Sequence, residues 1–222
     1  MLNLPDRSDR QQATRALLAA AGILPVVTVH SVEQALTIAE ALQRGGLHSI
    51  ELTLRTPVAL AAIAALKRAN PQLVVGAGTL LDPAQIAAAE QSGADFLVTP
   101  GTTPTMLAAL ARCPLPAIPG AATVSELLML AEHGFDTAKW FPAASLGGLA
   151  ALSALQGPLS HFKFCPTGGI GEGEAADYLA LPNVLCIGGS WMVSAAWTSD
   201  GHFDKISASA SRASAIVAAR QR

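Results

Sequence analysis

Eight short runs rich in β-branched and aromatic residues recur along the chain at a nearly constant spacing. Each run is closed by Gly, Pro, Ser or Thr and is followed by an alanine- and leucine-rich stretch that predicts a helix. The runs are LPVVTV from Leu24, SIELTL from Ser49, LVVGAGT from Leu73, FLVTPG from Phe96, PAIPGA from Pro116, TAKWFP from Thr137, HFKFCPTGG from His161 and VLCIGGSW from Val184. Their starts lie 20 to 25 residues apart, the length of a strand, a loop, a helix and a return turn.

Eight βα units in 222 residues predict an α/β fold of the (β/α)₈ TIM barrel type with an extra N-terminal helix. We expect a single domain over residues 1–222, because no linker rich in Ser, Gly, Pro or charge interrupts the repeat. The strands fall within 24–193, an N-terminal capping helix within 1–22, and the last helix within 204–219. The main alternative is a doubly wound open sheet, but its dinucleotide-binding form needs G-x-G-x-x-G where Val29-His30-Ser31 stands.

The composition excludes several classes of protein. Net charge is −2, and no stretch combines clustered Lys and Arg with aromatic residues, so we expect no nucleic-acid partner. The longest uncharged stretches, 140–162 and 178–199, contain Gly and Pro at several positions and predict no membrane helix. Three widely spaced cysteines indicate buried, reduced thiols without a chemical role, as in a cytoplasmic protein. The predicted partner is a small molecule.

The second run places three polar side chains on one face of its strand. Glu51, Thr53 and Arg55 are two residues apart in sequence, so they point the same way, toward the barrel axis. Functional groups of this fold lie where the strands end, at their carboxyl side. These residues are therefore candidates for a site, although an ion pair between Glu51 and Arg55 alone would also explain them.

The sixth run contains Lys139 between apolar and aromatic neighbours. Burial and a nearby cation such as Arg55 both disfavour the charged ammonium form, which makes a free amine available as a nucleophile. This is the requirement of Schiff-base chemistry. The alternative is that Lys139 only forms a buried ion pair with Glu51. Among the other lysines, Lys163 is the competitor, because it enters the seventh strand.

Glycine pairs close the seventh and eighth runs. Gly168 and Gly169 end one run, and Gly188, Gly189 and Ser190 end the next. Barrels commonly bind phosphate at these two neighbouring strand ends through backbone N–H groups, so the pair predicts a phosphate site. Two further strand ends complete the mouth of the barrel, with a hydroxyl at Thr79 and a rigid turn at Pro100.

Metal and hydrolase chemistry find no support in the sequence. The five histidines show no i, i+4 pairing and no spacing with carboxylates or thiols that is typical of a metal site. No G-x-S-x-G motif marks an activated serine. We expect neither a metal nor a cofactor.

Six motifs in order resemble the aldolases that act on 2-dehydro-3-deoxy-6-phosphogluconate (KDPG) and 4-hydroxy-2-oxoglutarate (KHG). They are ELTLRT from Glu51, GAGTLLDP from Gly76, PGAATVSEL from Pro119, KWFPA from Lys139, FCPTGGI from Phe164 and LCIGGSWMV from Leu185. The resemblance implies a class I aldolase, a homotrimer in most members, with Lys139 as the Schiff-base lysine and Glu51 as the acid/base. It also implies a substrate-binding set of Arg55 and Thr79 at the pyruvate carboxylate, with Pro100, Phe141, Thr167, Gly168, Gly169, Gly189 and Ser190 around the rest of the substrate.

Two departures from the family concern the pocket beyond the reacting carbons. Members often continue FPAE, whereas this chain has Ala144, and PGIST is replaced by PGAAT from Pro119. The expected reaction is cleavage of the gluconate-type substrate, with the galactonate-type stereoisomer as the alternative. A phosphosugar isomerase or epimerase and a non-catalytic phosphate-binding protein are the other hypotheses. An isomerase or epimerase would need facing acid/base groups or metal ligands at the strand ends, which the sequence does not show. A non-catalytic phosphate-binding protein would leave the buried Lys139 unexplained.

Overall fold

Strands and helices alternate along the chain in the computed structural model, which describes residues 7–220. The strands are β1 (Ile23–Val27), β2 (Ser49–Thr53), β3 (Val74–Gly78), β4 (Phe96–Val98), β5 (Ala117–Ile118), β6 (Gly120–Ala121), β7 (Thr137–Trp140), β8 (Lys163–Phe164) and β9 (Ile187–Gly189). The α-helices are α1 (Arg7–Ala21), α2 (Val32–Arg44), α3 (Ala59–Ala69), α4 (Pro83–Gln91), α5 (Pro104–Arg112), α6 (Val124–Glu132), α7 (Gly148–Leu155), α8 (Ala175–Ala180), α9 (Ala195–Ser199) and α10 (Phe203–Arg220). Short 3₁₀ turns, η1 (Ala144–Leu146) and η2 (Glu172–Glu174), precede α7 and α8.

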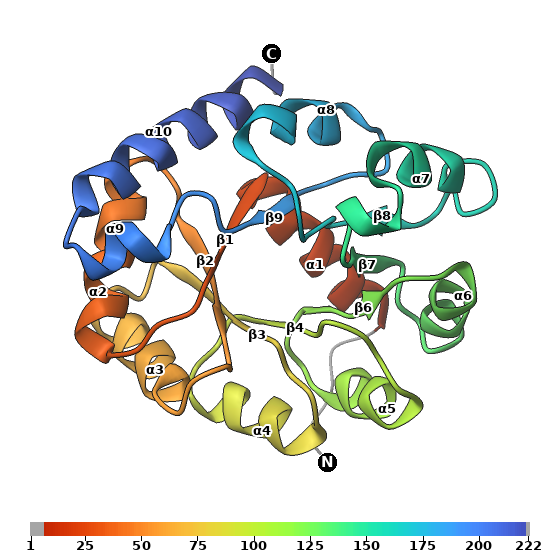
Figure 1. The fold of residues 1–222 in the computed structure, drawn as a ribbon. Coiled ribbons are helices and arrows are strands. Elements are labelled where there is room, and N and C mark those ends of the chain that lie inside the picture. The colour runs from red at the N-terminus through yellow and green to blue at the C-terminus, as the bar shows by residue number, and fades with distance from the viewer. Residues whose placement is uncertain (1–6, 221–222) are drawn as a thin grey trace.

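The strands form two parallel sheets inside a ring of helices (Figure 1). One sheet has the order β5-β4-β3-β2-β1-β9, and the other has the order β6-β7-β8. Single parallel bridges, Phe164 with Val184 and Thr167 with Gly188, connect the chain around β8 with the chain around β9. Only Pro119 separates β5 from β6. The run PAIPGA is therefore split between the two sheets where proline has no N–H for a ladder bond.

Two apolar layers lie on either side of the strands. The larger cluster fills the space between strands and outer helices, as a parallel sheet covered by helices requires. A smaller cluster joins side chains from the inner faces of several strands with Leu18 of α1, and its buried members are Leu18, Leu24, Phe96, Val98, Ile118, Cys165 and Cys186. The interior below the site is thus packed with side chains rather than open.

Helix α1 covers the amino ends of several strands. Arg10 donates hydrogen bonds to the carbonyls of Ala111 and Cys113, just before β5. Arg15 pairs with Asp136 at 2.8 Å, just before β7. The predicted capping helix therefore corresponds to α1, with residues 1–6 of the predicted range outside the described part of the chain.

The other boundaries differ from expectation by a few residues. Helix α10 extends over Phe203–Arg220, where the sequence predicts 204–219. Helix α9 is an additional short element that the repeat did not predict. β8 and β9 are shorter than their runs, because the glycines and prolines at their ends do not sustain a ladder. Within residues 7–220, no helix combines the length and apolar character that a membrane span needs.

Candidate active site

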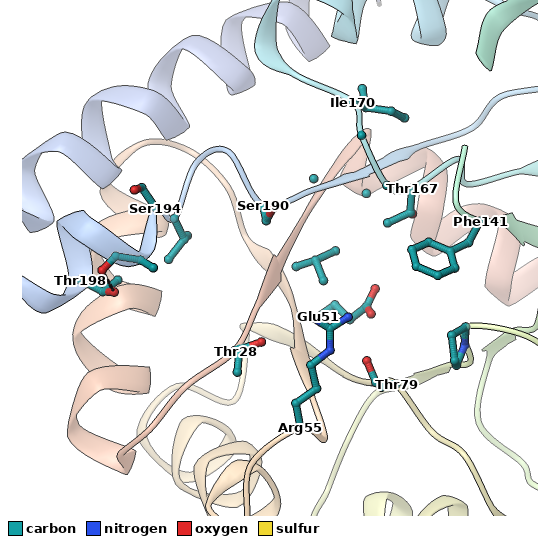
Figure 2. Close-up of a pocket in the computed structure, with 18 of the residues that line it drawn as sticks. Thr28, Glu51, Arg55, Thr79, Phe141, Thr167, Ile170, Ser190, Ser194 and Thr198 are labelled. Carbon is teal, nitrogen blue, oxygen red and sulfur yellow. Dashed lines mark hydrogen bonds between the residues drawn. The ribbon is translucent and has the colours of Figure 1, made fainter. Parts of the chain in front are cut away.

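A cavity of about 670 Å³ lies where the strands end at their carboxyl side. All eleven residues predicted from the sequence line it, and they are Glu51, Arg55, Thr79, Pro100, Lys139, Phe141, Thr167, Gly168, Gly169, Gly189 and Ser190. Figure 2 shows several of these side chains pointing toward a common centre near Glu51. The topology therefore brings together residues that are up to 139 positions apart in sequence.

The centre of the cavity holds an ion pair. Lys139 of β7 and Glu51 of β2 lie on different sheets, and Lys139 Nζ lies 3.2 Å from Glu51 Oε1. Both residues are buried, with 5% and 1% of their surface exposed. The Lys139 ammonium also lies 5.4 Å from the centroid of the Phe141 ring. Two buried charges of opposite sign that face a cavity are poised for proton exchange with a bound molecule.

Gly78 makes the room that Glu51 occupies. A Cβ atom at Gly78 would overlap Glu51 Oε1 and would lie 2.6 Å from Glu51 Cδ. No real Cβ contact is this short, so any side chain at Gly78 would displace the carboxylate. The second glycine of the GAGT motif is therefore part of the geometry of the ion pair.

Arg55 stands apart from this pair. Its guanidinium makes no hydrogen bond or ion pair with any residue between 7 and 220, and Figure 2 shows it reaching into the cavity beside Glu51. The simple alternative of a Glu51–Arg55 ion pair is therefore wrong, because Glu51 pairs with Lys139 instead. Thr53, the third residue of the predicted polar face, is buried and does not line the cavity. A free guanidinium in a cavity is suited to bind a carboxylate or phosphate.

Thr79 adopts an unusual backbone conformation at the cavity wall. Its φ angle is 60°, and it is the one non-glycine residue with positive φ in the described part of the chain. A β-branched residue in this region carries strain of about 1–3 kcal/mol, which persists only where the surrounding structure enforces it. Strain of this kind concentrates at functional sites.

Two glycine loops present backbone N–H groups to the cavity. Gly168 and Gly169 have φ angles of 96° and 78°, which a residue with a side chain rarely adopts. The N–H groups of Gly168, Gly169, Ile170 and Ser190 have no hydrogen-bond acceptor among residues 7–220. Unpaired N–H groups from neighbouring strand ends form a concave surface suited to an anion.

Sequence reasoning missed the wall formed by the β1–α2 loop and α9. The lining residues that were missed, with Ile170 of the glycine loop, are Val26, Thr28, His30, Gln34, Val193, Ser194, Ala195, Thr198 and Ser199. Gly188, which belongs to the predicted glycine pair, also lines the cavity. The alternation of Val26, Thr28 and His30 was a usable signal, since residues two apart on a strand share a face. Helix α9 offered none, because its five residues show no recognisable period.

The remaining candidates lie elsewhere. Lys163 donates to the Pro182 carbonyl outside the cavity, so it does not compete with Lys139. All three cysteines are free and buried, and burial raises the pKa of Cys113 and Cys186. Raised pKa values keep these two thiols protonated and unreactive. Across residues 7–220, no three His, Cys, Asp or Glu side chains gather in a way that could hold a metal ion.

Comparison with known proteins identifies the family. The family described as KDPG and KHG aldolase matches residues 14–209. The chain belongs to this aldolase family. The KHG/KDPG aldolase of Escherichia coli K12 is 44% identical over 194 residues, which cover 87% of this chain and 91% of that protein. The 2-dehydro-3-deoxy-phosphogluconate aldolase of Pseudomonas aeruginosa is 46% identical over 186 residues, 84% of each chain.

Solved structures of KDPG aldolases have the same fold. The Legionella pneumophila enzyme, captured with pyruvate as a covalent carbinolamine at low pH, superimposes with a TM-score of 0.87 and 41% identity. The match covers 89% of this chain and 96% of that one. The Zymomonas mobilis enzyme with 3-phosphoglycerate has a TM-score of 0.88 and 38% identity, covering 93% of this chain and 97% of that one. A family relative thus forms a covalent adduct with pyruvate.

Proposed function

We propose that this aldolase cleaves KDPG to pyruvate and D-glyceraldehyde 3-phosphate by class I chemistry, without a metal, and also cleaves KHG to pyruvate and glyoxylate. The observation that carries the proposal is the buried Lys139 amine, 3.2 Å from Glu51 and facing the cavity. A relative of 41% identity that traps pyruvate as a carbinolamine supports it.

Lys139 acts as the nucleophile. Proton transfer from its ammonium to a neighbouring base frees the amine, which attacks the C2 carbonyl of the substrate. The carbinolamine loses water and becomes a protonated imine. This cation draws electrons from the C3–C4 bond and weakens it.

Glu51 moves the protons. Its carboxylate, directly or through one water molecule, accepts the proton of the C4 hydroxyl as the C3–C4 bond breaks. Glyceraldehyde 3-phosphate leaves, and the two bonding electrons remain on C3 as an enamine. Glu51 returns a proton to C3, and water then hydrolyses the imine to pyruvate and the Lys139 amine.

The ends of the substrate are held by different groups. Arg55 and the Thr79 hydroxyl take the carboxylate, and the unpaired guanidinium suits a two-point contact. The phosphate lies on the N–H groups of Gly168, Gly169 and Ser190, with Gly189 allowing close approach. Pro100, Phe141 and Thr167 line the remaining wall. Binding energy at the phosphate orients the breaking bond, although the phosphate takes no part in the reaction.

The same proposal extends to the whole fold. We take residues 1–222 as one domain in which the two sheets form a single closed eight-stranded barrel with β5 and β6 as halves of one strand, capped by α1. The bridges between the chains around β8 and β9 support closure. The three free cysteines support a cytoplasmic location.

We also expect a homotrimer. Three large apolar side chains are exposed in the described residues: Leu81 at 63%, Val124 at 46% and Leu128 at 52%. Val124 and Leu128 are one turn apart on α6 and form a continuous apolar surface.

Light scattering should give three times the 22.7 kDa chain mass. Leu128→Asp should lower this mass because it buries a charge in the interface. Arg68→Asp, at an exposed position of α3, is the control and should leave the mass unchanged. A monomeric parent chain contradicts the expectation.

The Schiff base gives the most direct test of the reaction. Pyruvate with borohydride should produce a stable adduct on Lys139, located by mass spectrometry of peptides. Lys139→Arg should abolish the adduct, because guanidinium has no accessible free amine. Lys163→Arg is the matched control and should leave the adduct intact. An adduct on Lys163, or loss of activity with EDTA, contradicts the proposal.

Substitutions of Glu51 and Lys139 should abolish different steps of the reaction. Glu51→Gln should still be trapped by borohydride but should lose exchange of the pyruvate methyl protons with deuterated water. A positioned acid/base is worth about 10²- to 10⁴-fold, and the loss of exchange should fall in this range. Gly78→Ala should show the same pattern, because its Cβ displaces the Glu51 carboxylate.

Gly157→Ala is the control for the glycine variant, since a Cβ there meets nothing within 4 Å. If Glu51 only neutralised Lys139, trapping and exchange would fall together. Exchange at the parent rate in a folded Glu51→Gln protein would exclude the acid/base role.

Phosphate recognition predicts a difference between substrates. KHG has no phosphate and should react with a lower kcat/KM than KDPG. Gly169→Ala should reduce this difference, because its Cβ would lie 2.5 Å from Ala144 Cβ and the position has positive φ. Gly171→Ala, two residues away and with open space, should preserve it. Equal kcat/KM values for KDPG and KHG in the parent enzyme would contradict the proposed phosphate site.

A further inference from the structure

Two hydrogen-bonded threonines, of which one lines the cavity and the other is buried behind it, have no part in the mechanism described above. Thr28 directly follows β1 and lines the cavity, and Thr53 ends β2 and is buried with 1% of its surface exposed. Their hydroxyl oxygens lie 2.7 Å apart. A hydrogen bond this short, with one partner fully buried, holds the Thr28 side chain in one orientation.

The second contact of Thr53 sets the direction of this hydrogen bond. Thr53 Oγ1 lies 3.3 Å from the Val27 carbonyl oxygen, which can only accept. A threonine has a single hydroxyl proton, so Thr53 donates it to Val27 and accepts from Thr28. Thr28 has then used its own proton. Its oxygen still has acceptor capacity for a molecule in the cavity that Thr28 lines.

Several other polar groups on this wall form hydrogen bonds within their own segments. Thr198 and Ser199 donate to carbonyls within α9, and Gln34 Oε1 accepts the His30 N–H at 2.7 Å. In the view of Figure 2, Thr28 lies between the α9 group, marked by Ser194 and Thr198, and the catalytic Glu51. Thr28 is thus the group of this wall whose orientation is fixed by a buried residue of β2.

We propose that Thr28, held by Thr53, recognises the C5 hydroxyl of the substrate and thereby favours substrates that carry this hydroxyl. This inference rests on the proposed function. The carboxylate, C2, the C4 hydroxyl and the phosphate are assigned to other groups, and the C5 hydroxyl is the polar group that remains. It donates a hydrogen bond, which the Thr28 oxygen is oriented to accept. A site that pairs a substrate hydroxyl discriminates against an analogue without it, because the site's polar group is then left unpaired.

The synthetic direction allows this hydroxyl to be removed from the substrate. With pyruvate saturating, D-glyceraldehyde 3-phosphate supplies the C5 hydroxyl, and 3-oxopropyl phosphate is the same aldehyde without it. The parent enzyme should prefer the hydroxylated aldehyde in kcat/KM. Thr28→Val keeps the shape of the side chain and should reduce this preference about tenfold, the effect of one hydrogen bond in a partly buried site. Thr28→Ser restores the hydroxyl and should recover the preference.

Thr37→Val is the matched control, because the Thr37 hydroxyl lies on the surface of α2 and bonds the Glu33 carbonyl. It should leave the preference unchanged. If Thr28→Val lowers kcat/KM equally for both aldehydes, the preference is unchanged and the role of Thr28 is overturned. Borohydride trapping on Lys139 would still support the proposed function in that case. A parent chain that forms no adduct and no product with either aldehyde would overturn both.

Discussion

A buried ion pair between Lys139 and Glu51 is the constraint on which the site depends. The two residues belong to different sheets and are 88 positions apart, so their 3.2 Å contact exists only when the strands curve around a common interior. Removing both charges from water is costly, and either residue alone would be a buried, unpaired charge. The pair therefore ties the arrangement of the strands to the position of the Lys139 amine.

The structure separates apolar groups that pack against one another from polar groups that line the cavity. Below the ion pair, Leu18 of α1 and inner-face residues such as Phe96 form an apolar cluster without charged members. Above it lie the strained backbone of Thr79, with positive φ, and polar groups without partners among the described residues, namely the Arg55 guanidinium and the N–H groups of the glycine loops. The packed apolar layers and the polar residues at the carboxyl ends of the strands thus occupy separate parts of the fold.

The sequence predicted the strands and the cavity residues better than the contacts between them. Strand positions follow from a repeat that hydrophobic periodicity makes visible, and the cavity residues follow from their place at strand ends. The choice of Lys139 rather than Arg55 as the partner of Glu51 depends on which strands face each other across the interior. The left-handed conformation of Thr79 and the space at Gly78 depend on neighbouring backbone. None of these is encoded in local spacing, and neither is the wall that α9 adds.

The distribution of charge in the cavity matches the proposed substrate. Lys139 and Glu51 neutralise each other at the centre, where the substrate carries a ketone and a hydroxyl and no charge. Arg55 and the glycine N–H groups have no partners in the described residues, and these are the groups assigned to the carboxylate and the phosphate. An anionic molecule with charge at both ends therefore gains hydrogen bonds at its ends without disturbing the central pair. In the proposed mechanism Lys139 loses its ammonium proton before it attacks and becomes a cation again as the protonated imine. The main changes of charge therefore occur beside Glu51, the group proposed to move the protons.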